Sequence, residues 1–143
     1  MVSNDCLEWL RFASMDIDAA QQLYSQQQNP RQRPIEIILY HCQQGAEKAL
    51  KAFMVQNGHY PPKTHDLHDL RQICKQWDIG FDYTRLVNHC DFLDPFGVIV
   101  RYPNFYMSLD SSHAVRGLNS AKRIYDFVCE RLGLKKVYTS QNL

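Results

Sequence analysis

Charged side chains gather in one stretch of the chain, over residues 40–70. Glu47 and Lys51 are four residues apart, the spacing of an ordinary surface ion pair on a helix, which contributes only about 0.2–0.5 kcal/mol. Both project from the side opposite the apolar residues of the same stretch, so we expect them on a solvent-exposed face. Lys48 lies nearer the edge of the apolar face, close to His41 in helical angle. We therefore predict Lys48 as the better cation for a negatively charged ligand, with Lys51 as a second.

A second polar group follows at Thr64, His65 and Asp66, with His68 and Asp69 directly after it. Two histidines beside two aspartates could bind a metal, but a zinc site needs further ligands, and none is marked by spacing. We predict no metal and no cofactor. Thr64 fits the N-cap of a helix and Asp66 its first turn, where the helix dipole favours a negative charge. His65 stays a candidate ligand-binding residue that could share a cleft with a cation from another segment.

A third group is Arg101 followed by Tyr102 and Pro103. A guanidinium offers a planar fork for phosphate, and a tyrosine ring offers a face on which a base can stack. The alternative is structural, with Arg101 bonding the carbonyls at a helix end while Tyr102 packs. The sequence leaves both interpretations open.

Apolar residues recur at three-to-four spacing through most of the chain, which predicts helices. A lone strand at Val98 to Val100 would have no partner, so the segment from Pro95 to Pro103 is expected to be a helical turn running into a loop. We predict an all-α fold, an antiparallel up-and-down bundle of four main helices plus one short helix, in a single domain over residues 1–134 with a flexible tail over 135–143. The expected helices span residues 5–25, 34–57, 64–77 (the short one), 82–93 and 110–132, with N-caps at Asn4 or Asp5, Thr64, and Asp110 or Ser111.

The composition of the 143 residues excludes several classes of protein. A net charge of +1 is too small for a chain-wide nucleic-acid footprint. No apolar run is long enough to span a bilayer, and the first residues do not resemble a secretory signal, so we expect a cytoplasmic protein. The five cysteines are scattered without a paired motif and are expected to be reduced thiols in or near the core.

Three motifs occur in the order of a known family: Gln43-Gln44-x-x-Glu47-Lys48-x-Leu50-Lys51, then Thr64-His65-Asp66-Leu67, then Arg101-Tyr102-Pro103. In this order the chain resembles the HEPN (higher eukaryotes and prokaryotes nucleotide-binding) domains over roughly residues 5–132. The resemblance implies a helical bundle of four to five helices that is frequently dimeric. Many such domains work with a small nucleotidyltransferase in toxin–antitoxin or related modules, and others are metal-independent ribonucleases.

The ribonucleases of this family carry an arginine followed by a histidine after four to six intervening residues. Here Arg85 and His89 have three residues between them, Arg101 and His113 have eleven, and Arg33 is also too far from its nearest following histidine. The resemblance therefore gives no catalytic residues.

We expect a non-catalytic HEPN-like module that forms a homodimer and binds a nucleotide, an RNA or a nucleotidyltransferase partner. The ligand-binding residues would be Arg101, Tyr102, Lys48, Lys51 and His65. A metal-independent dimeric endoribonuclease with a degenerate site, using Arg85 with His89 or His113, is the alternative. Aromatic residues after Gly80 exceed the needs of a small core and are expected to supply part of a dimer interface.

Overall fold

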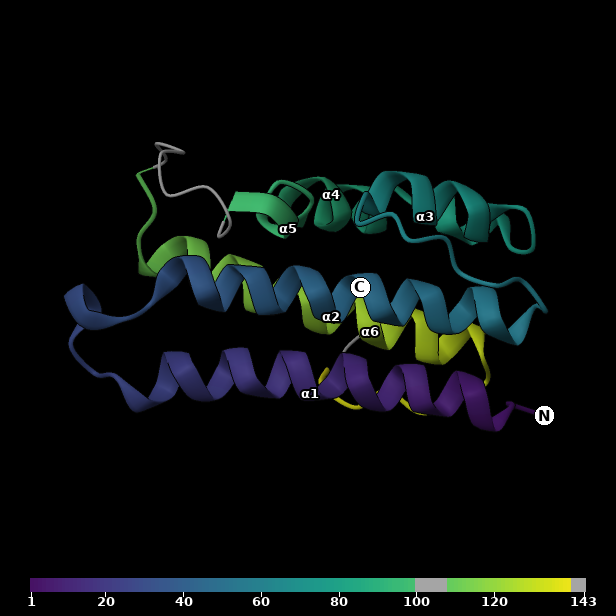
Figure 1. Cartoon of the computed structure of the whole chain (residues 1–143), viewed down its shortest axis with the longest axis horizontal. Helices are drawn as coiled ribbons and strands as arrows, with labels where there is room; N and C mark the ends of the chain where they lie inside the picture. Colours follow the sequence, from purple (N-terminus) through teal and green to yellow (C-terminus); the bar gives the residue numbers. More distant parts are fainter. Residues whose placement is uncertain (100–107, 140–143) are drawn as a thin grey trace.

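Three long helices form the body of the molecule. The structure is a computed structural model, and it describes residues 1–99 and 108–139. In it α1 (Asn4–Gln26) runs antiparallel to α2 (Ile35–Gln56), and α6 (Ser111–Arg131) lies beside both (Figure 1). A single 3-10 turn, η1 (Pro30–Gln32), joins α1 to α2. No strand occurs in the described ranges, and the predicted all-α bundle is confirmed.

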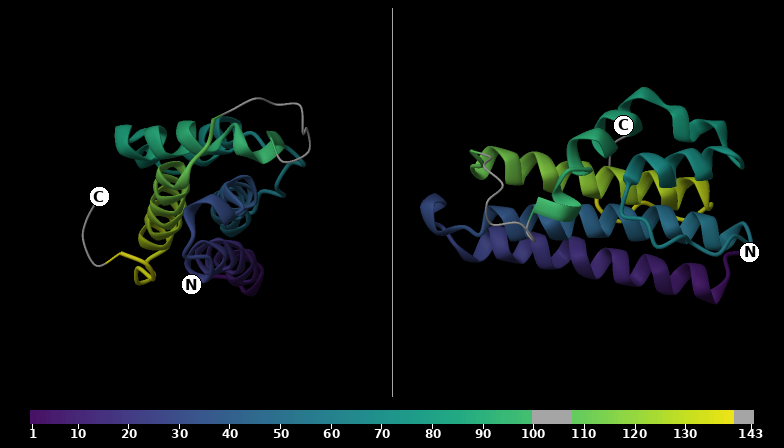
Figure 2. Two further views of the ribbon diagram at one scale, coloured as in Figure 1. Left: turned by 90° about the vertical axis from the view of Figure 1, so that its left-hand side faces the viewer. Right: turned by 45° about the horizontal axis from the view of Figure 1, so that its top comes forward.

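The shorter elements form a second layer over α2 and α6 (Figures 1 and 2). This layer comprises α3 (Leu67–Lys75), η2 (Ile79–Asp82), α4 (Thr84–Leu93) and α5 (Phe96–Ile99). Because α4 and α5 return against the direction of α2 and α6, the order α1, α2, α4–α5, α6 alternates up and down. The helical turn expected near Phe96 is present as α5, and the rest of that segment lies outside the described residues.

The predicted N-caps are wrong for two helices. Ser3 caps α1, since its Oγ accepts a hydrogen bond from the Cys6 backbone N–H at 3.1 Å. Asp66 caps α3 by accepting from the Asp69 N–H at 3.0 Å, whereas Thr64 only fixes the turn before it by accepting from the Asp66 N–H. In both cases the side-chain oxygen of the capping residue accepts from the backbone N–H three residues further along the chain, which is the usual geometry of an N-cap.

Other predicted boundaries need less correction. Asp110 caps α6 as expected, and Gly58 and Gly133 follow the ends of α2 and α6 with φ of 76° and 77°, the left-handed conformation that glycine adopts most easily. The fourth helix begins at Thr84 rather than near Asp82, because Asp82 belongs to η2 and pairs with basic residues of α3.

Helix α2 is the centre of the bundle and contacts α1, α3, α4, α5 and α6. Its approach to α1 depends on Gly45: a Cβ atom there would lie 2.6 Å from Cγ1 of Ile17 and 3.1 Å from the carbonyl oxygen of Ala13. All five cysteines are free and buried, and burial raises the pKa of the Cys42 thiol to about 12, which makes it chemically inert. In the part of the chain that the structure describes, no helix is long and apolar enough to cross a membrane.

The segment after α6 packs on the bundle. The buried carboxylate of Asp126 accepts hydrogen bonds from the backbone N–H groups of Val137, Tyr138 and Thr139 at 2.7–3.2 Å. The hydroxyl of Tyr138 donates to Asp18 of α1 at 2.9 Å. The loose tail expected from residue 135 is therefore wrong for residues 137–139, because a buried acceptor on α6 holds their backbone.

Candidate functional site: two carboxylate centres on the central helix

A buried carboxylate of α2 joins a lysine and a histidine. Glu47 accepts from Lys51 Nζ at 2.9 Å through Oε2 and from His65 Nδ1 at 2.9 Å through Oε1. The Glu47 and Lys51 side chains are 4% and 8% exposed, whereas the His65 side chain is 42% exposed. We call these three residues, with Gln43 and Gln44, the Glu47 centre.

The glutamines complete the Glu47 centre. Gln43 is fully buried, and its Nε2 donates to the backbone carbonyl of His65 at 2.8 Å. Gln44 Nε2 donates to Gln43 Oε1 at 2.8 Å and lies 3.4 Å from Glu47 Oε1. The close packing of Gly97 in α5 keeps Gln43 in place, since a Cβ there would lie 2.9 Å from its amide. Both the ring and the backbone of His65 are thus bonded to buried residues of one helix.

The prediction of a solvent-exposed face for Glu47 and Lys51 is wrong. The apolar stripe of α2 packs against part of the bundle, but the loop after α2 covers the opposite side of the helix. Trp9 of α1 covers it too, with the Lys51 ammonium 6.0 Å from the centre of its ring. Gln43, Glu47 and Lys51, at intervals of four residues, occupy this covered polar side. A helix covered over most of its surface must bury part of its polar face as well, and buried polar groups are tolerated only where they satisfy one another.

A second carboxylate, on α1, joins another lysine and histidine. Asp16 Oδ2 accepts from Lys48 Nζ at 2.6 Å, and Asp16 Oδ1 faces His41 Nδ1 at 2.9 Å. The side chains are 14%, 27% and 30% exposed for Asp16, Lys48 and His41. We call these three residues the Asp16 centre. Lys48 and His41 do share one side of α2, as their helical angle predicts.

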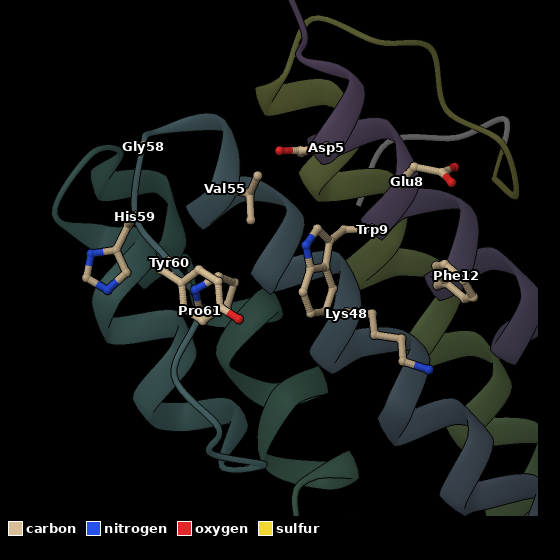
Figure 3. A pocket seen from close by; sticks show the side chains of 10 residues that line it. All are labelled: Asp5, Glu8, Trp9, Phe12, Lys48, Val55, Gly58, His59, Tyr60 and Pro61. Carbon is tan, nitrogen blue, oxygen red and sulfur yellow. The ribbon is translucent and has the colours of Figure 1, made fainter.

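The structure separates some predicted site residues and joins others. Lys51 and His65 meet at Glu47, while Lys48 turns to Asp16 and lines a groove between α1 and α2 (Figure 3). The predicted ligand-binding residues Arg101 and Tyr102 lie outside the described residues. Sequence reasoning missed Asp16, which stands in no pattern that distinguishes it from an ordinary polar residue of a helix. Gln43 was named only as part of the family motif, although its four-residue spacing from Glu47 was a signal for its place in the site.

The residues of the nuclease alternative have structural partners. His113 completes a capping box with Asp110 at the start of α6, where its Nδ1 accepts from the Asp110 backbone N–H at 3.2 Å. His89 Nδ1 lies 2.9 Å from Ser120 Oγ. Burial lowers the pKa of His89, and the nearby Arg123 and Arg116 lower it further.

The residues near His65 do not form a metal site. His68 Nδ1 is 2.9 Å from Nη2 of the buried Arg71, and Asp66 is the N-cap of α3. Among the residues with described positions, no group of three or more histidine, cysteine, aspartate or glutamate side chains is arranged to hold a metal ion.

These features define the protein as a small helical bundle with polar clusters at its central helix. The sequence model of the HEPN domain matches residues 6–132, and the chain therefore belongs to the HEPN domain family. None of the curated proteins compared with the sequence matches it significantly.

Two crystal structures have the same fold. The archaeal HEPN homologue ST0689 is 22% identical, with a TM-score of 0.68 over 89% of this chain and 97% of its own. TT1696 from Thermus thermophilus is 24% identical, with a TM-score of 0.70 over 90% of this chain and 99% of its own. At these identities the likeness concerns the fold.

Proposed function

We propose that this HEPN domain is a non-catalytic module that forms a homodimer and binds the phosphate groups of a nucleotide or RNA. A nucleotidyltransferase would be its protein partner, in a system of the toxin–antitoxin type. The observation that carries the ligand proposal is the Glu47 centre, in which a half-exposed histidine is bonded to a network of buried groups. Family membership supports the ligand class, since nucleotide binding gives the HEPN domain its name.

The chemistry of His65 suits such a ligand in either protonation state. With the ionised Glu47 opposite Nδ1, that nitrogen carries a proton and Nε2 is left for the ligand. A doubly protonated ring donates Nε2–H to a phosphate oxygen while Glu47 balances its charge. A neutral ring instead accepts a hydrogen bond from a ribose hydroxyl. Lys51 acts through Glu47, because its ammonium is covered and already paired.

Arg101, Tyr102 and Lys48 complete the proposal. Arg101 would hold phosphate and Tyr102 would stack on or orient a base, as predicted from the sequence. Lys48 would add positive charge by exchanging its partner Asp16 for a phosphate oxygen, and its side chain is 27% exposed.

Binding of a fluorescent single-stranded RNA oligomer and of ATP tests the ligand proposal. We expect His65→Ala and Arg101→Ala each to weaken binding about tenfold, the effect of one charge-assisted hydrogen bond. The exposed Lys63 and Arg31 serve as matched controls, since Lys63→Ala and Arg31→Ala remove a charge elsewhere. Equal binding by all four variants and the parent, or binding by none of them, would contradict the proposal.

The homodimer is a separate part of the proposal. Of the aromatic residues expected at an interface, Phe81 and Phe96 are in the core, while Tyr83 is 46% exposed. Val98 of α5 and Val115 of α6 add exposed apolar surface, at 44% and 50%. Light scattering at micromolar concentration should give the mass of two chains, and a monomer would count against this part.

The nuclease alternative and the partner have their own tests. Metal-free cleavage of RNA by the purified protein, lost in both His89→Ala and His113→Ala, would favour the endoribonuclease. A nucleotidyltransferase gene beside the gene for this chain, together with co-purification of the two products, would favour the partner role.

A further inference from the structure

A groove of about 550 Å³ runs between α1, α2 and the loop that follows α2 (Figure 3). This volume is within the range of sites that enclose a small ligand or the side chains of a short peptide. We call it the α1–α2 groove. It is lined by Asp5, Glu8, Trp9 and Phe12 of α1, Lys48 and Val55 of α2, and Gly58, His59, Tyr60 and Pro61 of the loop.

The walls of the groove expose aromatic side chains that nothing in the bundle covers. The Phe12 side chain is 46% exposed and Tyr60 is 88% exposed. The two chain neighbours of Tyr60 are anchored, because the His59 ring packs edge-on against Trp77 at 5.7 Å and Pro61 is buried. Exposed aromatic residues that line one concave surface are a mark of an interaction site.

Trp9 is also fixed in position. Its ring extends from α1 across α2 toward the loop in Figure 3, and the Lys51 ammonium of the Glu47 centre lies 6.0 Å from the ring centre. A cation at this distance is attracted to the face of an indole. The groove therefore presents one positioned aromatic ring, Trp9, beside the more exposed Phe12 and Tyr60.

The charges of the groove select the ligand. Lys48 is already neutralised by Asp16 at 2.6 Å. Asp5 has no ion pair with any residue in the described ranges. The Glu8 carboxylate, in contrast, already accepts from Nε and Nη2 of Arg11 at 2.8 and 3.2 Å, and this guanidinium lies 4.7 Å from the centre of the Phe12 ring. The lining is thus apolar with an acidic edge, which opposes a phosphate and attracts a cation.

We propose that the α1–α2 groove docks a short segment of a partner protein that carries an arginine next to a large aliphatic residue. The guanidinium lies at Asp5, the acid of the groove that has no ion pair in the described ranges, and the aliphatic side chain lies between Trp9 and Tyr60. Arginine suits this place because its planar group both pairs with carboxylates and stacks on aromatic rings. The proposal does not rest on the phosphate ligand of the Glu47 centre, since the groove has the opposite charge preference.

Fluorescence of Trp9 reports directly on the groove. The chain has two tryptophans, so Trp77→Phe leaves Trp9 as the only one. Three probes are titrated into this variant of the full chain: acetyl-Ser-Arg-Leu-Leu-Ser-amide, the same peptide with Glu in place of Arg, and adenosine monophosphate. We expect the arginine peptide to change the Trp9 emission saturably, with the glutamate peptide and the nucleotide binding at least several-fold more weakly.

Variants test the charge and the aromatic wall separately. Asp5→Asn should weaken the arginine peptide roughly threefold, as expected for one exposed ion pair, and remove the preference over the glutamate peptide. Asp91→Asn, at an exposed acid outside the groove, should change nothing. Tyr60→Ala should weaken both peptides without unfolding the protein, because this side chain is almost fully exposed.

Three outcomes would overturn the docking proposal. One is no response to the arginine peptide, or an equal response to both peptides. Another is tighter binding of adenosine monophosphate, which would make the groove a nucleotide site. The third is self-association that Tyr60→Ala abolishes, which would show that a second copy covers the groove. RNA binding by the parent and the His65→Ala variant tests the proposed function separately. Failure of the groove proposal therefore says nothing against the proposed function, and the reverse also holds.

Discussion

The Glu47 centre and the Asp16 centre use the same three kinds of residue in different surroundings. Each has a carboxylate that meets one lysine ammonium and one histidine Nδ1 at 2.6–2.9 Å. In the Glu47 centre the ion pair lies within one helix and is nearly inaccessible to solvent. In the Asp16 centre the pair bridges α1 and α2, and water reaches its members. The exposed member also differs, being the histidine in the first centre and both the lysine and the histidine in the second.

This difference determines what each centre can contribute. A charge in a low-dielectric interior interacts strongly but is costly to leave unpaired, whereas a pair near water is worth little. The Glu47 centre is thus a rigid support for His65. The Asp16 centre is a modest link between two helices, and Lys48 can change partners there at small cost.

Lys51→Met should have the largest effect on stability. The substitution leaves the Glu47 carboxylate buried with His65 and Gln44 beside it but no lysine, and breaking a buried pair in this way costs about 3 kcal/mol or more. Urea denaturation of the variant and the parent gives this difference. The double variant Glu47→Leu with Lys51→Met should recover much of the lost stability, because it leaves no buried charge unpaired. If Lys51→Met destabilised the protein less than Lys48→Met, the distinction between the two centres would be wrong.

Gly45→Ala should rank second. A Cβ at Gly45 meets Ile17 and a backbone carbonyl of α1, so the helices must separate. Overpacking of this kind lowers the free energy of unfolding by about 1–3 kcal/mol. The higher helix propensity of alanine offsets roughly 1 kcal/mol of that loss. Only the Asp16 centre bridges these two helices. The coupling between Asp16 and Lys48, measured by a double-mutant cycle, should therefore fall in the Gly45→Ala background while that between Glu47 and Lys51 is kept.

Lys48→Met should cost at most about 1 kcal/mol, because Asp16 keeps His41 and contact with water. This is the matched control for Lys51→Met, being the same change three residues away on the same helix. Added salt should reduce the Lys48→Met effect but not the Lys51→Met effect. If salt changed the stability effects of Lys48→Met and Lys51→Met equally, the two ion pairs would not differ in solvent exposure as described.

The smallest expected effect on stability is that of His89, a histidine that, unlike His65 and His41, has no carboxylate as its hydrogen-bond partner in the described residues. His89 lies near Arg116 and Arg123, and burial lowers its pKa below the ordinary value of 6.5. The unfolded chain then binds more protons than the folded one, so the stabilising contribution is present above pH 6.5 and is lost as the pH falls toward the lower folded pKa. The free energy of unfolding should decline less between about pH 7 and 5 in His89→Gln than in the parent. An identical pH profile would contradict the assignment.

Helix existence was predictable because it depends on local pattern. The spacing of apolar residues predicted the long helices, and Gly58, Gly133 and Asp110 marked their ends by their own backbone and capping preferences. The choice of Asp66 over Thr64 as a cap was not predictable, since both can accept from a nearby N–H. The packing of residues 137–139 was not predictable either, because it depends on Asp126 a dozen residues earlier.

The candidate site was predictable only in part. The sequence singled out His65, Lys48 and Lys51 as candidate site residues. It also predicted correctly that Lys48 and His41 lie on the same side of α2. The exposure of Glu47 and Lys51 was predicted wrongly, since helical spacing says which side of a helix a residue takes but not what lies against that side. Gln43, Glu47 and Lys51 at four-residue intervals were the available signal that this polar side is one continuous surface.

The sequence by itself determined the helices, most of their ends and the family, because these depend on local conformational preference and on ordered motifs. Tertiary structure decided that the Glu47 side of α2 is covered, that Glu47 rather than solvent receives Lys51 and His65, and that Asp16 receives Lys48. The physical reason is that the strength of an ion pair depends on its surroundings. Those surroundings come from Trp9, from the loop after α2 and from α5, which are distant in sequence and meet only in the folded bundle.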